Sequence, residues 1–342
     1  MKRYLRILSL AMFAVLSSCT HKDLCLNHPE HAHRYHVNVI ADYRYEWEEP
    51  ENGTDWEKAW PVHYLPYESL RPGKPQGLRV VNYDTDGSYN IHNLSADGGI
   101  VYLYEGLNDL LFYNNDTEYI IFTRHIDEAT TRASTRASTR ARTRATYKGS
   151  EFADEDESTV TAPDMLYANY IEDYYAEKVI DPKDIEITLH PLVFTYKIRY
   201  EFAEGLEYVT MARGALSGMA SSVLMNTGFT SDDAATILYD CEVTDFGVRA
   251  IVKSFGIPGY PNSNYPTRSG EKHALNLELM LKNGNIVNFD FDVSEQVSSQ
   301  PHGGVVVVSG IVVTEEDGTQ GTGAFDVSVN DWGEYEDVEI PF

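Results

Sequence analysis

Short runs of alternating apolar and polar residues, bounded by Gly, Asn, Asp and Pro, recur along this chain of 342 residues. Residues 35–39, 185–189 and 194–200 are clear examples, and few segments show helical periodicity. A period of two puts successive side chains on opposite faces of a strand, so the pattern predicts an all-β protein. The 24 tyrosines fit such strands, because a half-buried pleated surface accepts the ring while the hydroxyl reaches water.

The clearest local prediction is a hairpin over residues 273–293. Leucines alternate along residues 275–281, and apolar residues alternate again from Val287 to Val293. A two-residue Asn-Gly turn would set polar side chains opposite the leucines and break the buried face. We therefore expect a three-residue loop over residues 283–285, with Asn285 left-handed. Its register pairs Leu281 with Val287, Leu279 with Phe289 and Leu277 with Phe291.

Two further patterns carry local expectations. Residues 305–308 are four consecutive valines, and such an uninterrupted apolar run suits a strand that is buried on both faces. Residues 84–87 and 315–318 contain the acidic residues and glycine of a calcium loop without its full set of ligands. We expect a hairpin turn at both places.

The first residues have the three parts of a secretory signal: a basic start, an apolar run over residues 7–16, and small residues before a cysteine. The run is too short for the roughly 20 residues that span a bilayer. Leu16-Ser17-Ser18-Cys19 resembles the lipobox of bacterial lipoproteins; the alternative is a plain signal with a chance cysteine. We expect residues 1–18 to be removed, a lipid on Cys19 and a lipidated tether over residues 19–34. Two acyl chains would anchor it stably, because each buried CH₂ contributes about 0.8 kcal/mol.

The net charge and the cysteine and histidine residues limit which partners, disulfides and metal sites we expect. The formal net charge of −26 repels phosphate backbones, so nucleic acid is not an expected partner. Cys25 and Cys241 are too few for a disulfide scaffold in a chain of this length, and we expect two separate thiols. Five histidines lie near Cys25, but a tether does not fix four ligands at one point, so no metal site is expected. They are His21, His28, His31, His33 and His36.

The organisation of the chain follows from composition. Residues 130–146 repeat a Thr-Arg-Ala-Ser unit that cannot bury a face, which predicts a disordered surface loop. The alternative is a site for an arginine-specific protease. A new strand pattern starts at Ile185, after Asp181-Pro182. We therefore expect one domain over residues 35–181 and a second over residues 182–342.

Several passages give the chain a resemblance to the fimbrillin-like lipoproteins of anaerobic gut and oral bacteria, particularly their anchor-type relatives. These passages span most of the mature chain. They are residues 19–25, Tyr113-Asn114-Asn115-Asp116-Thr117-Glu118, residues 190–194 with residues 211–219, and Asp331-Trp332.

The resemblance implies two Greek-key β-sandwich domains and a role in fimbria assembly or surface attachment, on the outer membrane at the cell surface. Other fimbrial subunits would be the partners. In related stalk subunits a protease cuts after an arginine, removes an N-terminal strand and frees a groove for another subunit's terminal strand, which binds through main-chain hydrogen bonds. The tail residues Val338, Ile340 and Phe342 alternate as such a donor strand would, although a plain last strand is the alternative.

The sequence departs from the family pattern in two ways. No processing arginine is evident at the matching place, which favours an anchor or accessory subunit over a stalk subunit. The first strand has Asp42-Tyr43 where relatives tend to have Asp-Trp.

Catalytic chemistry is not indicated. The chain lacks a P-loop, G-x-G-x-x-G, H-E-x-x-H and C-x-x-C, so we expect no enzyme and no cofactor. Trp47, Trp56 and Trp60 lie together in a tyrosine-rich region; they either pack in a core or interface, or form a platform that stacks sugars. The alternative function is therefore a surface glycan-binding lipoprotein of a nutrient-uptake system.

Overall fold

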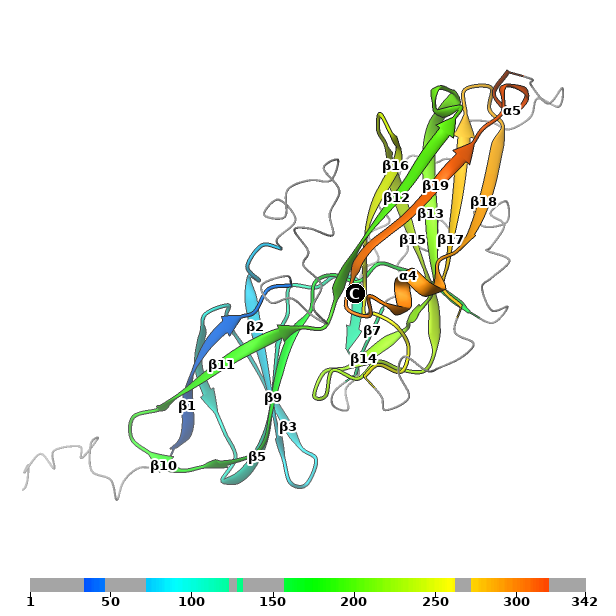
Figure 1. Ribbon diagram of the computed structural model, residues 1–342. Helices are drawn as coiled ribbons and strands as arrows, with labels where there is room; N and C mark the ends of the chain where they lie inside the picture. The colour runs from blue at the N-terminus through cyan, green and yellow to red at the C-terminus, as the bar shows by residue number, and fades with distance from the viewer. Residues whose placement is uncertain (1–33, 47–71, 123–127, 132–156, 262–271, 320–342) are drawn as a thin grey trace, which may run out of the picture.

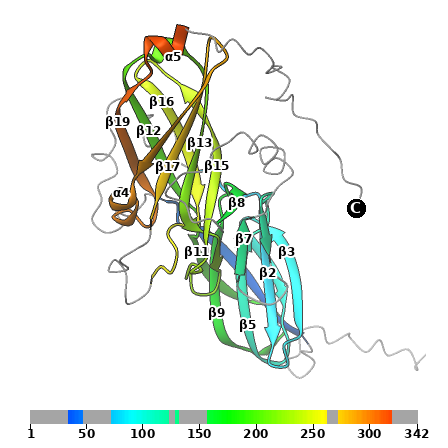
Figure 2. The same ribbon diagram turned by 90° about the vertical axis from the view of Figure 1, so that its right-hand side faces the viewer.

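The computed structural model describes residues 34–46, 72–122, 128–131, 157–261 and 272–319. They form two β-sheet lobes arranged end to end, with β1 starting at the far end of the N-terminal lobe and α5 at the far end of the C-terminal lobe (Figures 1 and 2). We call these two ends the base and the tip. The predicted all-β class with two sandwich domains is confirmed. The expected tether lies outside the described residues except for Arg34, which is the first residue of β1.

The N-terminal lobe is one sheet that folds over into two layers. Its strands are β1 (Arg34–Tyr43), β2 (Gly77–Asp84), β3 (Tyr89–Ser95), β4 (Gly98–Tyr102), β5 (Gly106–Asn114), β9 (Tyr167–Ala176), β10 (Lys178–Val179) and β11 (Lys183–Pro191). The sheet is narrow between β3 and β4, and between β11 and β9, where only one and two residue pairs form. These corners separate a layer β4-β1-β11 from a layer β3-β2-β5-β9.

The C-terminal lobe has the same construction. Its strands are β8 (Ser158–Thr161), β12 (Phe194–Glu204), β13 (Val209–Ala220), β15 (Ala234–Val243), β16 (Gly247–Ser254), β17 (Ala274–Leu281), β18 (Ile286–Asp292) and β19 (Gly304–Val312), with short helices at Leu206–Tyr208 (3-10), Ser294–Ser298 (α4) and Glu315–Thr319 (α5). One layer is β16-β12-β19, and the other is β18-β17-β13-β15 with β8 beside β15.

Both lobes repeat one topology. In the N-terminal lobe, β2, β3 and β4 follow one another and β5 returns beside β2; in the C-terminal lobe, β13, β15 and β16 do so and β17 returns beside β13. A fourth strand that returns beside the first is the Greek key, as the family resemblance implied. The first strand of each lobe then lies beside its last strand, β1 beside β11 and β12 beside β19.

Alternation explains why these residues form strands. In β1, Val39, Ala41 and Tyr43 are buried in the core between the two layers, while Ile40 and Asp42 between them are exposed. The same period puts Tyr196, Ile198 and Tyr200 of β12 into the core of the C-terminal lobe. Each lobe thus closes over its own hydrophobic core.

A third, smaller sheet joins the lobes. It contains β6 (Ile120–Phe122), β7 (Glu128–Thr131) and β14 (Ser222–Leu224), in the order β14-β7-β6. Around it a third hydrophobic cluster combines residues of both lobes, among them Leu111 of β5, Val193 and Phe255. We call this cluster the joint.

The predicted domain boundary is wrong in two respects. β11 comes after Asp181, yet it pairs with β1 and completes the N-terminal lobe. β8 comes before the boundary, yet it pairs with β15 of the C-terminal lobe. The predicted loop over residues 130–146 also starts too early, because β7 extends to Thr131; the rest of that segment lies outside the described residues.

The predicted hairpin forms, with its register displaced by two residues. Leu279 lies opposite Val287 and Leu277 opposite Phe289, so the apolar faces match as expected. The backbone of Leu281 donates a hydrogen bond to Asn285 at 2.8 Å, which makes the loop Lys282 to Gly284. Gly284 rather than Asn285 takes the left-handed conformation (φ 84°), because glycine has no Cβ to oppose it.

Two further local expectations need correction. The valine run forms β19 at the edge of its layer, and of its four valines only Val306 is fully buried. Residues 84–87 form the expected turn before β3, but residues 315–318 begin helix α5. Thr314 and Asp317 hydrogen-bond reciprocally there, with the Asp317 amide donating to the Thr314 hydroxyl at 3.1 Å. This is the capping box that a Thr-x-x-Asp spacing favours.

Candidate functional site: strand edges and a pocket at the base

The first strand after the tether is a central strand. β1 pairs in parallel with β11 through seven residue pairs and antiparallel with β4 through five. Beyond β1, the buried Glu46 side chain accepts a hydrogen bond from the backbone of Thr195 at 2.5 Å, at the start of β12. The N-terminal strand is therefore held on both sides and linked at its end to the C-terminal lobe.

Arg44 directly follows β1 and is exposed. Its backbone donates a hydrogen bond to the carbonyl of Leu189 at 2.9 Å. A cut after Arg44 would separate β1 from the rest of the chain. The expectation that no processing arginine lies at the matching place stays a prediction.

The edge of β19 is covered by two glutamine side chains. The Gln296 carboxamide donates to the carbonyl of Val307 at 3.0 Å and accepts from its amide at 2.9 Å. Gln300 repeats this pattern on Val305, at 3.0 and 2.8 Å. A Cβ on Gly304 would lie 2.0 Å from the Gln300 Oε1 atom, so a larger residue there would displace the Gln300 side chain from this edge. The two amides thus take the place of a neighbouring strand over these two residues, and we call them the glutamine pair.

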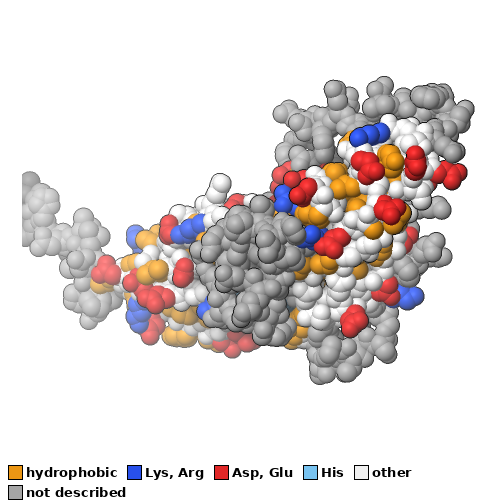
Figure 3. Space-filling view, turned by 45° about the horizontal axis from the view of Figure 1, so that its top comes forward, with side chains coloured by type: hydrophobic (Ala, Val, Ile, Leu, Met, Phe, Trp, Pro, Cys, Tyr) orange, Lys and Arg blue, Asp and Glu red, His pale blue; other side chains and the backbone are white. Residues whose placement is uncertain are grey.

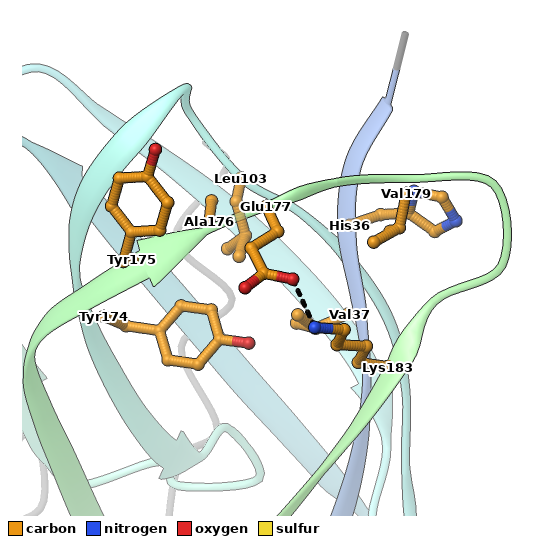
Figure 4. Close-up of a pocket in the computed structure, with 9 residues that line it drawn as sticks. All are labelled: His36, Val37, Leu103, Tyr174, Tyr175, Ala176, Glu177, Val179 and Lys183. Carbon is orange, nitrogen blue, oxygen red and sulfur yellow. Dashed lines mark hydrogen bonds and ion pairs between the residues drawn. The ribbon is translucent and has the colours of Figure 1, made fainter. Parts of the chain in front are cut away.

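A shallow pocket lies at the base, where β1 begins (Figure 4). Its volume is about 350 Å³, including the solvent at its mouth. Lys183 and Glu177 form an ion pair across it, and the Tyr174 ring lies beside them, as Figure 4 shows. The lining residues are His36, Val37, Leu103, Tyr174, Tyr175, Ala176, Glu177, Val179 and Lys183.

Two tyrosines and a lysine at the base keep their ordinary charge state at neutral pH. A hydrogen bond with Glu105 raises the pKa of Tyr35 to about 12. Burial raises the pKa of Tyr174, with Lys183 acting in the opposite direction. The hydrogen bond to Glu177 raises the pKa of Lys183, so its ammonium stays charged. The neutral phenol rings can stack on a polar ligand, and their hydroxyls and the ion pair can hydrogen-bond to it.

Acidic side chains lie scattered over both lobes in the view of Figure 3 and do not gather in one patch. Within the described residues, no three His, Cys, Asp or Glu side chains are placed to hold a metal ion. His36 is the member of the histidine group that the structure describes, and it is buried on β1. Cys241 is half-buried on β15. No helix in the described part of the chain combines the length and hydropathy that crossing a bilayer requires.

Most sequence-predicted site residues lie outside the described residues. This holds for Cys19, Cys25, the aromatic group Trp47, Trp56 and Trp60, and the candidate donor strand Val338, Ile340 and Phe342. The glutamine pair was not predicted from the sequence, because residues 294–300 have the composition of a polar loop. A spacing of four residues between Gln296 and Gln300 is the available signal, since it puts both on one side of a helical turn.

The fold defines the class: a two-lobed all-β protein in which both lobes are Greek-key sandwiches. The chain belongs to the family described as a domain of unknown function, DUF5119, whose model matches residues 68–240. That match begins before β2 and ends within β15, so it covers parts of both lobes and the joint between them.

The chain is similar to several solved structures. A candidate adhesin from Bacteroides ovatus is 20% identical, with a TM-score of 0.54, and the match covers 87% of this chain and 95% of that one. The fimbrial anchor protein Mfa2 from Porphyromonas gingivalis is 13% identical, with a TM-score of 0.43, and the match covers 80% and 90%. The expected resemblance to fimbrillin-like surface proteins is confirmed at the level of the fold. No curated protein sequence matches the chain.

Proposed function

We propose that this chain is an adhesion-type surface protein, a fimbrial anchor or accessory subunit that is held in the outer membrane by a lipid on Cys19. One observation carries the proposal: β1, the first strand after the proposed tether, is locked between β4 and β11. A lipid at one end of such a strand fixes the whole lobe to the membrane. The shared fold with a candidate adhesin supports the adhesive part.

Retention of β1 separates an anchor from a stalk subunit. If the native protein keeps β1, the lipid stays connected to both lobes; if a protease cuts after Arg44, lipid and β1 are lost together. We expect mass spectrometry of protein from native cells to find an acylated chain that begins at Cys19 and continues uncut through Arg44. A mature chain that begins at residue 45 would contradict the anchor role.

Attachment of a lipid to Cys19 can be tested directly. Wild-type protein should incorporate labelled palmitate and enter the detergent phase of a detergent partition, whereas Cys19→Ala should remain unlabelled and aqueous. The Cys25→Ala variant is the matched control, because it changes a cysteine of the same tether outside the lipobox. Aqueous, unlabelled wild-type protein would refute the anchoring.

Partner capture is proposed to use the tail, with Val338, Ile340 and Phe342 as the alternate side chains of a donated strand. Deleting residues 338–342 should reduce capture of co-expressed fimbrial subunits in a pull-down and leave the melting temperature unchanged. Substituting the intervening Glu339 by Gln keeps the alternation and should leave capture intact. Equal capture by the truncated and full-length chains would remove strand donation from the proposal.

The second candidate function is glycan binding, and the pocket at the base favours it. Tyr175 lines the pocket with 65% of its surface exposed, and the pair of Glu177 and Lys183 offers polar partners to a sugar. A glycan array on the soluble protein discriminates between the candidates. Sugar binding that Tyr175→Ala, Trp56→Ala or Trp60→Ala abolishes would favour the uptake role, and a blank array would favour the fimbrial one.

A further inference from the structure

The first and last strands of each lobe run side by side in the same direction. β1 and β11 are parallel over seven residue pairs, from Val37 opposite Lys183 to Tyr43 opposite Leu189. β12 and β19 are parallel over seven pairs, from Tyr196 opposite Gly304 to Glu204 opposite Val312. Among the described strands the one other parallel pair is β15 with β8; all remaining pairs are antiparallel.

This direction decides how a pull along the molecule acts on the strands. β1 starts at the base, and β11 leaves the N-terminal lobe toward the tip (Figure 1). A pull on the base draws β1 down, while a pull on the tip draws β11 up through β12. Two parallel neighbours pulled at opposite ends slide along each other, so all their hydrogen bonds are loaded together. Antiparallel neighbours pulled from one end would instead separate one bond at a time.

The same argument holds in the C-terminal lobe. β12 is pulled at its base end and β19 at its tip end, where the chain continues into α5. The Ser309 hydroxyl donates to the Glu201 carboxylate across this pair at 2.7 Å, and the Val313 amide donates to the carbonyl of Glu204 at 3.1 Å. The first bond bridges the irregularity in the ladder between the Tyr200 and Phe202 pairs, and the second extends the contact beyond the last pair.

Sliding would also expose buried side chains. β1 would have to draw Val37, Val39 and Tyr43 out of the core, and the Tyr43 hydroxyl would lose its bond to the carbonyl of Ala96 at 3.1 Å. On β12 the fully buried Tyr196 and Tyr200 move with the strand.

The link between the lobes transmits a pull without extending. Only Leu192 and Val193 separate β11 from β12. Val193 is fully buried in the joint, and the bond from Thr195 to Glu46 holds the start of β12 against the segment that follows β1. The two parallel ladders are therefore connected in series by a packed link.

We propose that this protein resists tension along its long axis through two shear clamps in series, β1 with β11 and β12 with β19. The clamps hold the chain folded while its base and its tip are pulled apart. This deepens the proposed function, on which it rests for the source of the pull: a membrane at the base and a partner at the tip. The mechanical property itself belongs to the folded chain.

The test compares two pulling directions in one lobe. Handles are attached through cysteines at exposed positions of the full mature chain, with its own cysteines replaced by serine. Arg34→Cys with His190→Cys pulls β1 and β11 along the strands, and Arg34→Cys with Asp181→Cys peels them apart from the base. In an optical trap we expect a severalfold higher unfolding force in the first geometry, because forced unfolding follows the unfolding barrier in the loaded direction. Equal or lower force along the strands overturns the proposal.

A matched pair of variants tests whether β1 itself resists the pull. Val39→Ala on β1 and Val80→Ala on β2 remove the same atoms from the same core, where both valines are buried. Val39→Ala should lower the force of the Arg34–His190 pull more than Val80→Ala does, and equal reductions would contradict the clamp. Because purified protein is pulled without membrane or partner, this result is independent of the lipid and capture tests. Those tests can fail while the clamp stands, and the clamp can fail while they succeed.

Discussion

At the scale of single residues, one buried ion pair makes the C-terminal lobe sensitive to the loss of a single partner. Glu278 of β17 is fully buried and lies opposite Arg213 of β13, with which it forms an ion pair. Burial raises the pKa of the Glu278 carboxyl, and the Arg213 guanidinium opposes that shift. The arginine is therefore what keeps a charged carboxylate tolerable at this position.

Removing the arginine alone should be costly. We expect Arg213→Ala to reduce the free energy of unfolding by about 3–5 kcal/mol at neutral pH, because an uncompensated charge stays buried. Urea denaturation measures this loss. Replacing both residues by leucine should recover most of it, since an apolar pair has no charge to desolvate. A double variant as unstable as the single one would show that packing rather than charge is responsible.

His273 predicts a specific pH dependence. It is fully buried beside Gly218 and Asp292, and burial lowers its pKa from 6.5 to about 4. The folded state thus disfavours the charged ring, so its contribution is complete above pH 6.5 and is lost as the pH falls toward 4. The loss amounts to about 3 kcal/mol. Urea midpoints between pH 7 and 4 should fall less steeply in His273→Gln than in wild type; parallel curves would contradict the assignment.

At the scale of elements, the sequence predicts which face of a strand is buried better than it predicts which residues and strands that strand pairs with. The hairpin of β17 and β18 has the predicted apolar faces, because a displacement by two residues keeps the alternation intact. Its register depends on which residue takes the left-handed position, and Gly284 does so at lower cost than Asn285. The valine run shows the same limit, since composition identifies a strand but not its place at an edge.

The glutamine pair predicts a change in self-association. An open strand edge invites pairing with another chain, and Gln296 and Gln300 occupy this edge at Val307 and Val305. We expect the double alanine variant to form concentration-dependent dimers, seen by light scattering after size exclusion. Glu295→Ala is the matched control, because that side chain is exposed on the same helix. A monomeric double variant would show that this edge needs no cover.

At the scale of the whole molecule, the joint should make the two lobes unfold together. Phe255 is 1% exposed in the cluster that both lobes share. Phe255→Ala should cost about 3–5 kcal/mol and split one calorimetric transition into two, because the contact that couples the lobes is lost. Ile251→Ala, at a position 48% exposed, should stay within about 0.5 kcal/mol of wild type. Two transitions already present in wild type would refute the coupling.

The division into lobes was the part of the fold that local sequence could not supply. β11 begins after a clear break at Pro182, yet it pairs with β1, the first strand of the lobe in the sequence. β8 precedes β9 of the N-terminal lobe in the sequence, yet it pairs with β15 of the C-terminal lobe. Such pairings depend on which surfaces remain uncovered after the nearer strands have paired, and no pattern within either strand records this. The glutamine pair could not be predicted for the same reason, because its role depends on lying beside the edge of β19.

The parallel pairing of β1 and β11 has a consequence for the proposed export. Asn38 and Asp184 are joined by a hydrogen bond across 146 positions of the chain, and contacts of such sequence separation form slowly. During synthesis β1 emerges first, and its neighbour β11 emerges much later. The arrangement proposed to resist pulling in the finished protein would therefore delay folding of the nascent chain. If the chain is exported as proposed, this delay would keep it unfolded until it has crossed the membrane.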